Sequence, residues 1–300
     1  MIISAKNEER IMRHQSGNGE DFEDCTHDCS SCSSNCSHAQ GGGGMDFSEF
    51  KKPLMPGASV KKVFAVMSGK GGVGKSMVTA LLAKGMQERG YKAAVLDADI
   101  TGPSIPRLFG LNESAEATET YLFPSISSKG TQVMSMNLLL GYAGEPVVWR
   151  GPVLAGVVTQ FWSDVLWEEV DYMFVDMPPG TGDVPLTVFQ SLPVEGVIIV
   201  TTPQELVSDI VEKAVNMTAI VDIPIVALVE NMSYFKCPDC GEVHEIFGKS
   251  KIKEESERFD INLSVRLPMD TEFSKLADEG RIEEAVAKEM KPLLDLIEKI

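Results

Sequence analysis

Residues 68–76 read Ser-Gly-Lys-Gly-Gly-Val-Gly-Lys-Ser, and this glycine-rich stretch constrains the fold more than any other part of the chain. The apolar run 63–67 before it is typical of a buried parallel strand, and residues 77–90 after it carry apolar side chains at helical spacing. Between a strand and a helix, the pattern G-x-x-x-x-G-K-[ST] cradles phosphates, because backbone N–H groups and the positive end of the helix converge on the anion. The stretch therefore predicts a P-loop that binds ATP. The residues predicted to contact the nucleotide are Gly69, Lys70, Gly71, Gly72, Val73, Gly74, Lys75 and Ser76.

Three side chains of this loop have distinct expected roles. Lys75 is predicted to contact the β- and γ-phosphates as a catalytic residue, and the Ser76 hydroxyl to bind Mg²⁺. An ordinary P-loop does not need Lys70, which would then be a solvated loop charge. However, residues 70–76 resemble the deviant Walker A loop of the MinD, ParA and nitrogenase iron protein class. This resemblance implies that Lys70 is a catalytic residue that reaches across a homodimer interface to the partner's nucleotide.

The rest of the chain alternates between strand and helix patterns. Apolar runs predict buried strands at 63–67, 93–96, 132–136, 172–175, 197–201, 225–229 and 261–265. Helical patterns occur at 77–90, 153–166, 206–220 and 273–277, and the segment 282–300 closes the chain. Such alternation predicts an α/β fold with a mostly parallel sheet and helices on both faces. Ligands of these sheets bind beyond the carboxyl ends of the strands, where the P-loop lies.

Carboxylates follow two of the predicted strands. Asp176 ends the apolar run 172–175 and is interpreted as a Walker B residue that holds Mg²⁺, the alternative being a strand-capping Asp without a ligand. Asp97 and Asp99 follow the strand 93–96. Asp99 is predicted to orient or deprotonate the attacking water, and Asp97 to support the magnesium shell, although spacing does not decide which carboxylate does which.

Composition excludes several classes of partner. The chain has 300 residues, 43% of them apolar, which suffices for one sizeable α/β core and a tail. A formal charge of −17 disfavours a nucleic-acid surface or a basic membrane-binding patch. The sequence contains no long apolar run and no signal-peptide core at its beginning, so we expect a cytoplasmic protein. In that compartment its six cysteines indicate metal or redox chemistry before disulfides.

The division expected from composition is a flexible tail, 1–45, and a P-loop ATPase domain, 46–300. The tail is acidic, poor in core-forming residues and ends in a run of four glycines, so any order in it must come from a ligand. Its cysteines are Cys25, Cys29, Cys32 and Cys36. Closely strung cysteines suit a second [4Fe–4S] cluster, whereas zinc sites more often pair two units across a longer insert; zinc or an empty reduced tail are the alternatives.

Cys237 and Cys240 form a C-x-x-C pair followed by Gly241. Such a turn can aim two thiolates at one metal, but one pair fills only half of a four-thiolate site. Two chains related by a twofold axis could share one [4Fe–4S] cluster. Zinc, with His244 as a possible third ligand, and a dithiol redox pair are the other interpretations that the motif itself allows.

The loop around Lys70 and Lys75, the stretches 97–104 and 176–183, Glu-Asn-Met-Ser at 230–233 and the C-x-x-C pair together resemble the Mrp (ApbC) family of iron–sulfur cluster carrier ATPases. The resemblance covers about residues 50–285, with the motifs in family order. It implies a homodimer in which Cys237 and Cys240 of each chain bridge a [4Fe–4S] cluster, and ATP hydrolysis coupled to cluster transfer to apo-proteins. It also implies that Asn231 lies at the adenine base; independently, Asn231 follows a predicted strand, and its amide can donate and accept hydrogen bonds.

Two other functions use the same dimer switch. A MinD/ParA-type positioning ATPase with a zinc-bound C-x-x-C is the principal alternative, but the acidic C-terminal segment disfavours membrane or DNA binding. An electron-transfer reductase similar to the nitrogenase iron protein is disfavoured, because the cysteines of the nitrogenase iron protein are not paired as C-x-x-C.

Overall fold

The computed structural model describes residues 50–300 except 101, 119, 140–150 and 204–206. The predicted tail, 1–45, lies outside the described residues, and so do its four cysteines. The strands are β1 (Val60–Ser68), β2 (Ala93–Asp97), β3 (Ser125–Ile126), β4 (Gln132–Met134), β5 (Val170–Asp176), β6 (Val194–Thr201), β7 (Ile225–Lys236), β8 (Val243–His244) and β9 (Ser264–Pro268). The α-helices are α2 (Lys75–Glu88), α3 (Ile105–Leu108), α4 (Gly151–Ser163), α5 (Asp183–Ser191), α6 (Val207–Ile220), α7 (Ile252–Arg258), α8 (Thr271–Asp278) and α9 (Lys291–Ile297). Short 3₁₀ helices are η2 (Met136–Leu138), η3 (Ile282–Glu284) and η4 (Lys288–Met290).

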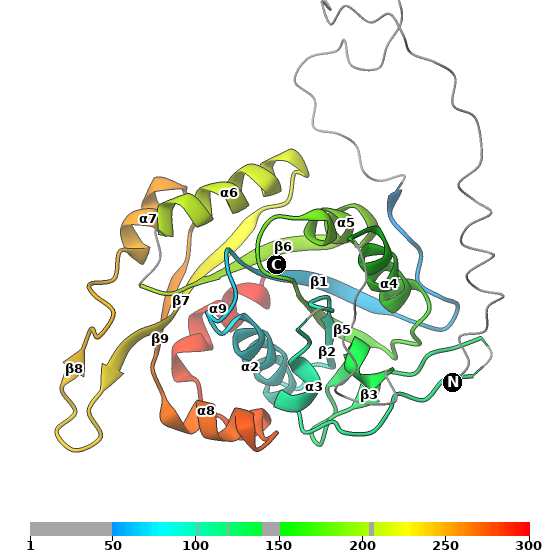
Figure 1. Cartoon of the computed structure of the whole chain (residues 1–300), viewed down its shortest axis with the longest axis horizontal. Coiled ribbons are helices and arrows are strands. Elements are labelled where there is room, and N and C mark those ends of the chain that lie inside the picture. The colour runs from blue at the N-terminus through cyan, green and yellow to red at the C-terminus, as the bar shows by residue number, and fades with distance from the viewer. Residues whose placement is uncertain (1–49, 101, 119, 140–150, 204–206) are drawn as a thin grey trace, which may run out of the picture. The chain divides into compact units, whose positions relative to one another are not determined.

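The strands form one twisted sheet in the order β3-β4-β2-β5-β1-β6-β7-β8, with β9 also paired to β7 (Figure 1). Pairing is parallel except between β3 and β4 and between β7 and β8. The predicted α/β fold with a mostly parallel sheet is therefore confirmed. β1 lies between β5 and β6, so the loop that follows it opens at the middle of the sheet's carboxyl edge.

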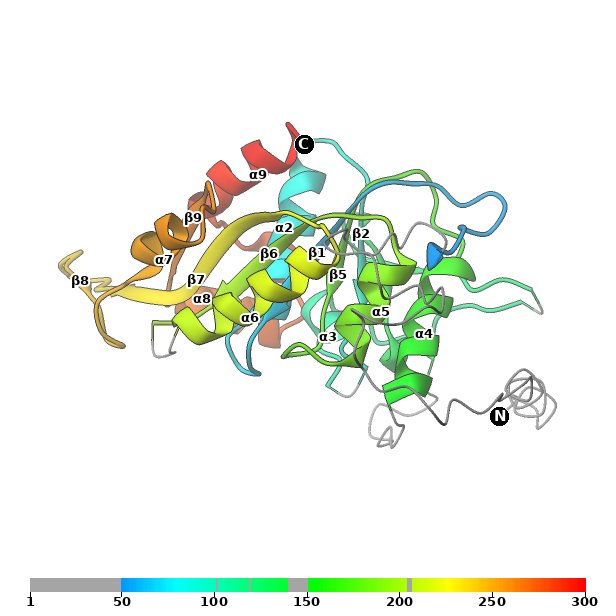
Figure 2. The same ribbon diagram turned by 90° about the horizontal axis from the view of Figure 1, so that it is seen from above.

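Helices cover both faces of the sheet (Figures 1 and 2). Along β1, Val63, Ala65 and Met67 pack into a core with α4, α5 and α6, whereas Phe64 and Val66 pack on the opposite face with α2, α8 and α9. This alternation follows from the two-residue period of a strand. Burial on both faces explains why the strand sequence is a continuous apolar run.

Several predicted boundaries differ from the structure, and the differences at β7 and β9 have a clear physical reason. β7 was expected to end at residue 229 but continues to Lys236, because Glu230 and Asn231 are polar residues that are nevertheless buried in it. β9 lies at 264–268 instead of 261–265, since Ile261 closes the turn after α7 through its N–H to the Ser256 carbonyl. The closing segment 282–300, for which no single element was predicted, contains η3, η4 and α9; α9 begins at Lys291, where Pro292 fits the first turn of a helix.

The end of β7 carries an antiparallel hairpin away from the main sheet. β8 returns along β7 through the pairs Phe235↔His244 and Lys236↔Val243. Figure 1 shows this hairpin at the opposite end of the sheet from β3. Because β7 is parallel to β6 and β1, its hairpin extends from the same carboxyl edge at which the loop after β1 opens. In the described part of the chain, no helix is long and apolar enough to cross a membrane.

Candidate nucleotide and metal sites

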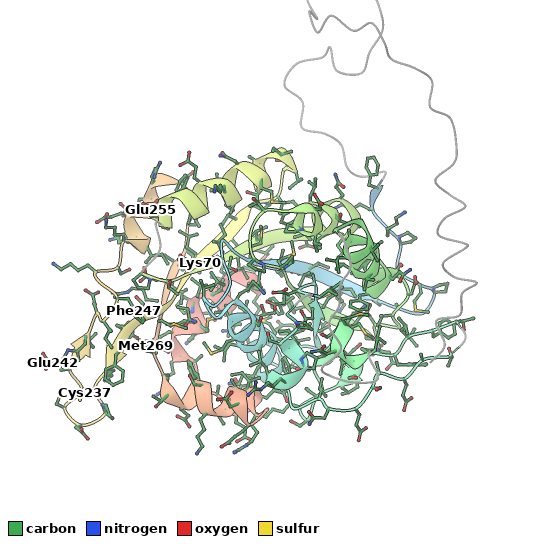
Figure 3. The ribbon with its side chains drawn as sticks, viewed as in Figure 1. Lys70, Cys237, Glu242, Phe247, Glu255 and Met269 are labelled. Atoms are coloured by element: carbon green, nitrogen blue, oxygen red, sulfur yellow. The ribbon has the colours of Figure 1, made fainter. Side chains whose placement is uncertain are left out.

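The glycine-rich loop joins β1 to α2, as the sequence predicts. β1 ends at Ser68 and α2 begins at Lys75. Gly72 and Gly74 have φ of +84° and +82°, a conformation that side chains with a Cβ rarely adopt, so glycine is required there. Lys70 is exposed on this loop (Figure 3). The loop and the first turn of α2 therefore offer the backbone N–H groups that a phosphate cradle needs.

Asp176 is the centre of a buried polar cluster below this loop. It ends β5, next to β1, and is fully buried. Its carboxylate accepts hydrogen bonds from Ser76 Oγ at 2.6 Å and from Thr79 Oγ1 at 2.8 Å, and Lys75 Nζ lies 2.9 Å from Oδ1. Hydroxyl and carboxylate oxygens are the donors that Mg²⁺ prefers, so Ser76 and Asp176 fit the predicted magnesium site.

The two carboxylates at the end of β2, Asp97 as its last residue and Asp99 just beyond it, lie beside Asp176. β2 pairs with β5 so that Asp97 is in register with Asp176. Asp97 is buried; Ser135 Oγ donates to it at 2.9 Å, and the Asp99 backbone N–H donates at 3.2 Å. Burial raises the pKa of Asp97 to about 8, and the charge of Asp176 acts in the same direction. Asp99 is partly exposed, with Oδ2 at 4.0 Å from Lys75 Nζ, so it is the carboxylate of the pair that faces outward.

Asn231 lies within β7 instead of following it, and its side chain contacts the glycine-rich loop. Its Nδ2 donates to the Val73 carbonyl at 2.9 Å, while its Oδ1 is buried without a hydrogen-bond partner in the described residues. A Cβ at Gly74 would lie 2.2 Å from Nδ2. Asn231 therefore tightens the junction between the loop and β7; its contact with adenine stays a prediction.

The structure brings the predicted residues Lys75, Ser76, Asp97, Asp99 and Asp176 together at the carboxyl edge of β1, β2 and β5. It also adds two residues that we did not predict from the sequence, Thr79 and Ser135. Thr79 lies one turn after Ser76 on α2, so a polar residue inside the otherwise apolar run 78–83 was the available signal. The position of Ser135 depends on the pairing of β4 with β2, which no local pattern specifies.

Cys237, labelled in Figure 3, and Cys240 lie in the loop of the β7–β8 hairpin. Cys237 N–H donates to the Glu242 carbonyl and Gly241 N–H to the Cys237 carbonyl, both at 2.9 Å, which closes a tight turn. Both thiols are free, and Cys240 is exposed. The backbone N–H groups of Cys240 and Asp239, and the Cys240 thiol, lower the pKa of Cys237. The turn therefore favours the thiolate, which is the form that binds metals.

Among the described residues, no further metal ligands gather beside these two thiols. No group of three or more Cys, His, Asp or Glu side chains in this part of the chain could hold a metal ion. The Nε2 atom of His244, the possible third ligand for zinc, lies 3.9 Å from Glu242 Oε2. The hairpin thus presents two thiols, half of a four-thiolate site.

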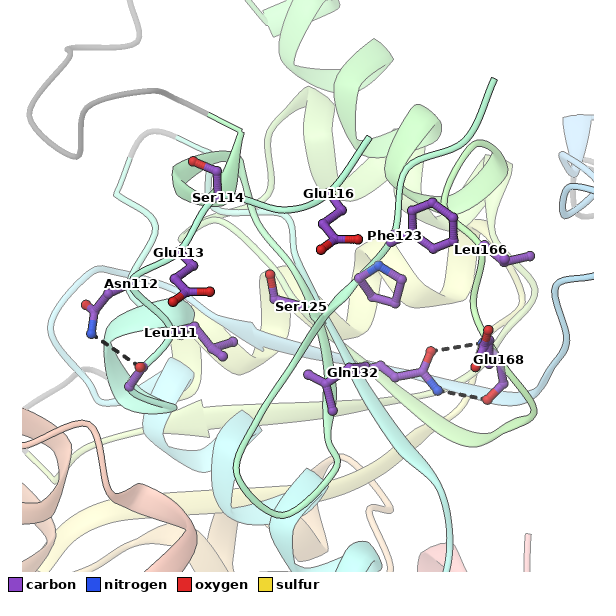
Figure 4. A pocket seen from close by; sticks show the side chains of 13 residues that line it. Leu111, Asn112, Glu113, Ser114, Glu116, Phe123, Ser125, Gln132, Leu166 and Glu168 are labelled. Atoms are coloured by element: carbon purple, nitrogen blue, oxygen red, sulfur yellow. Dashed lines mark hydrogen bonds between the residues drawn. The ribbon is translucent and has the colours of Figure 1, made fainter. Parts of the chain in front are cut away.

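A pocket of about 570 Å³ lies elsewhere, between β3, β4 and the segment 110–124 (Figure 4). Glu113, Glu116 and Glu168 line it together with apolar side chains, among them Leu111 and Phe123. Its carboxylates would repel phosphates, which disfavours a second nucleotide site there.

Comparison with known proteins relates the whole described domain to one family. Residues 59–300 match the ParA family described as NUBPL iron-transfer P-loop NTPase. The chain is 42% identical over 279 residues to the iron-sulfur cluster carrier protein of Clostridium perfringens, covering 90% of this chain and 97% of that protein. It is 39% identical over 242 residues to the cytosolic Fe-S cluster assembly factor CFD1 of Saccharomyces cerevisiae, covering 78% of this chain and 83% of that protein.

Solved structures show the same fold. A nucleotide-binding protein from Archaeoglobus fulgidus in complex with ADP is 44% identical, with a TM-score of 0.68, covering 75% of this chain and 88% of that one. The cell division ATPase MinD of Pyrococcus furiosus is 18% identical, with a TM-score of 0.56 over 79% of this chain and 98% of that one. At that identity the likeness to MinD shows the fold alone.

Proposed function

This chain belongs to the family of NUBPL-type iron-transfer P-loop NTPases, and from that premise we propose that it is an ATP-hydrolysing carrier of a [4Fe–4S] cluster. The family and the relatives named as cluster carriers favour this function over a MinD-type positioning ATPase. The observation that carries the proposal is that the same carboxyl edge of the sheet bears both a complete phosphate loop and a hairpin with two free cysteines. Coupling of ATP hydrolysis to cluster transfer requires both sites in one chain.

ATP is held at the loop between β1 and α2. The N–H groups of residues 69–76 and the N-terminus of α2 face the phosphates, and Lys75 neutralises the β- and γ-phosphate charge. Ser76 and Asp176 hold Mg²⁺, which, when bound, supplies charge neutralisation at the transferring phosphate. Thr79 keeps the Asp176 carboxylate in place through its hydrogen bond to Oδ1.

Hydrolysis is in-line attack of water on the γ-phosphate. Asp99 orients that water, because it is the outward-facing carboxylate beside Lys75. Asp97 supports the arrangement from below: it accepts hydrogen bonds from Ser135 and from the Asp99 backbone. Lys70 acts in trans, on the nucleotide of the second chain in a homodimer, and its exposure on the loop is compatible with such a reach.

The cluster is cargo. Two thiolates from Cys237 and Cys240 supply half of its ligands, and the same pair from a second chain supplies the other half across a twofold axis. Opening or tightening of the dimer during the ATP cycle then governs loading and delivery to apo-proteins in the cytoplasm. The four tail cysteines hold a second [4Fe–4S] cluster, a proposal that rests on their spacing in the sequence.

The test separates the two cysteine groups. In a chain with Cys25, Cys29, Cys32 and Cys36 all replaced by Ala, the hairpin remains the candidate cluster site. After anaerobic reconstitution, this variant is expected to bind iron and sulfide and to activate an apo-enzyme that requires a [4Fe–4S] cluster.

Adding Cys240→Ala to that variant is expected to abolish iron binding and leave the affinity for ATP within about twofold, because no described contact joins this exposed thiol to the P-loop. Zinc instead of iron in the anaerobically purified chain would overturn the carrier function, and loss of ATP binding with Cys240→Ala would overturn the separation of the two sites.

A further inference from the structure

β7 bends between the residue that contacts the glycine-rich loop and the cysteine hairpin. Its pairing with β9 passes from Glu230↔Arg266 to Tyr234↔Pro268, so β7 places three residues where β9 places one. Within this bulge Met232 has φ of +54°, which is costly for a residue with a Cβ. Asn231, which donates to the Val73 carbonyl, is the first residue of the bulge. A strained bulge keeps its shape only if neighbouring contacts hold it.

Arg266 supplies those contacts on one side. Its Nε donates to Ser233 Oγ at 2.6 Å, and the Ser233 hydroxyl donates in turn to Glu230 Oε2. The Glu230 carboxylate is fully buried, and Arg266 Nε lies 3.7 Å from its Oε2. A buried carboxylate is stable only with hydrogen bonds and a nearby cation, so the guanidinium is tied to this position.

The other side of the same guanidinium reaches the hairpin. Nη2 of Arg266 donates to Glu245 Oε1 at 2.7 Å, and Glu245 directly follows β8. The guanidinium also lies over the Tyr234 ring, 5.5 Å from its centroid. β8 is two residues long, and an isolated two-stranded hairpin is marginally stable in water. The contact with Glu245 therefore fixes the returning arm of the hairpin to the core.

We propose that Arg266 is a positioning residue for the cysteine hairpin, which it fixes to the part of β7 that contacts the glycine-rich loop. The planar fork lets one side chain bind Ser233 and Glu245 at once, which the single ammonium of lysine cannot reproduce. The cysteines themselves make no such anchor, since Cys240 is exposed and the turn is closed by its own backbone. The relevance of Arg266 to cluster binding rests on the proposed function. Its effect on the orientation of the hairpin does not depend on that function.

The test therefore begins without a cluster. Amide hydrogen exchange is measured on the full-length apo-protein for the N–H groups of Cys237 and Gly241, both of which close the turn. Arg266→Lys keeps a charge near buried Glu230 but loses the fork. Glu245→Gln changes only Glu245, the partly exposed partner of Arg266 in the hairpin. This variant therefore still tests the proposal if Arg266→Lys lowers the stability of the whole domain.

Both variants are expected to speed exchange in the turn about threefold, since each weakens a partly exposed charge-assisted hydrogen bond at the base of the hairpin. Arg281→Lys is the matched control: Arg281 makes a similar fork to Glu279 and Glu284 on the surface, away from the hairpin. It is expected to leave the turn unchanged.

A second readout uses the reconstituted protein. In the background without the four tail cysteines, iron is expected to pass to a chelator about threefold faster from Arg266→Lys and Glu245→Gln than from Arg281→Lys. Exchange in the turn equal to that of the control in both variants would overturn the inference. Absence of iron from the wild-type chain, with the exchange difference present, would instead overturn the proposed function and leave the role of Arg266 standing.

Discussion

Gly74→Ala tests the contact between the glycine-rich loop and β7. The added Cβ meets two obstacles. Gly74 has φ of +82°, and an alanine there costs about 1–2 kcal/mol in the left-handed region. The Cβ would also lie 2.2 Å from Asn231 Nδ2, so the amide must leave the Val73 carbonyl.

The second obstacle has a separate magnitude. Displacing Asn231 leaves the Val73 carbonyl and the amide without their hydrogen bond in a buried site, which costs about 1–3 kcal/mol. Together the two terms predict that Gly74→Ala lowers the free energy of unfolding by about 2–5 kcal/mol. Gly72→Ala is the matched control, because Gly72 has φ of +84° but no atom within 4 Å of a Cβ. We expect it to cost only about 1–2 kcal/mol.

Urea unfolding of the nucleotide-free protein, followed by the fluorescence of the buried residues Trp162 and Trp167, measures both variants. Combination with Asn231→Ala isolates the clash: in that background the cost of Gly74→Ala is expected to fall to the value of Gly72→Ala. Equal costs for Gly74→Ala and Gly72→Ala in the wild-type background would refute the reasoning, since the collision with Asn231 would then contribute nothing.

Two further changes probe the nucleotide site. Lys70→Ala is expected to leave the unfolding temperature unchanged, because the side chain is exposed, and to lower ATP turnover at least about tenfold; turnover equal to wild type would exclude a lysine that acts in trans. Without nucleotide or Mg²⁺, Asp97 is expected to contribute a fall in the free energy of unfolding as pH rises from about 4 to about 8. The cause is that folded Asp97 retains a proton which the unfolded chain has lost. Asp97→Asn should remove up to about 1.4 kcal/mol per pH unit of this slope, and an unchanged slope in urea titrations would assign the effect to other groups.

The sequence predicts those parts of the site that depend on local pattern. The glycine-rich loop, the end of β5 at Asp176 and the pair of carboxylates after β2 each follow from an apolar run and the residues beside it. Their assembly also follows, because the carboxyl ends of parallel strands meet at one edge of the sheet.

Contacts between distant segments could not be predicted in this way. Ser135 contacts Asp97 because β4 pairs with β2, and Arg266 contacts Ser233 because β9 pairs with β7. Neither pairing leaves a periodic signal in the sequence. The continuation of β7 through Glu230 and Asn231 was also missed, since these buried polar residues interrupt the apolar pattern. Their hydrogen bonds, to Ser233 within β7 and to the Val73 carbonyl of the glycine-rich loop, leave no signal in that pattern.

The mass of the intact reconstituted protein tests the central claim most directly. The chain is used with its four tail cysteines replaced by Ala, and native mass spectrometry is recorded with and without Cys240→Ala. The account predicts a dimer that carries a single [4Fe–4S] cluster, and loss of that cluster in the Cys240→Ala variant. A metal ion or cluster bound to each separate chain, or a dimer whose cluster survives Cys240→Ala, would contradict it.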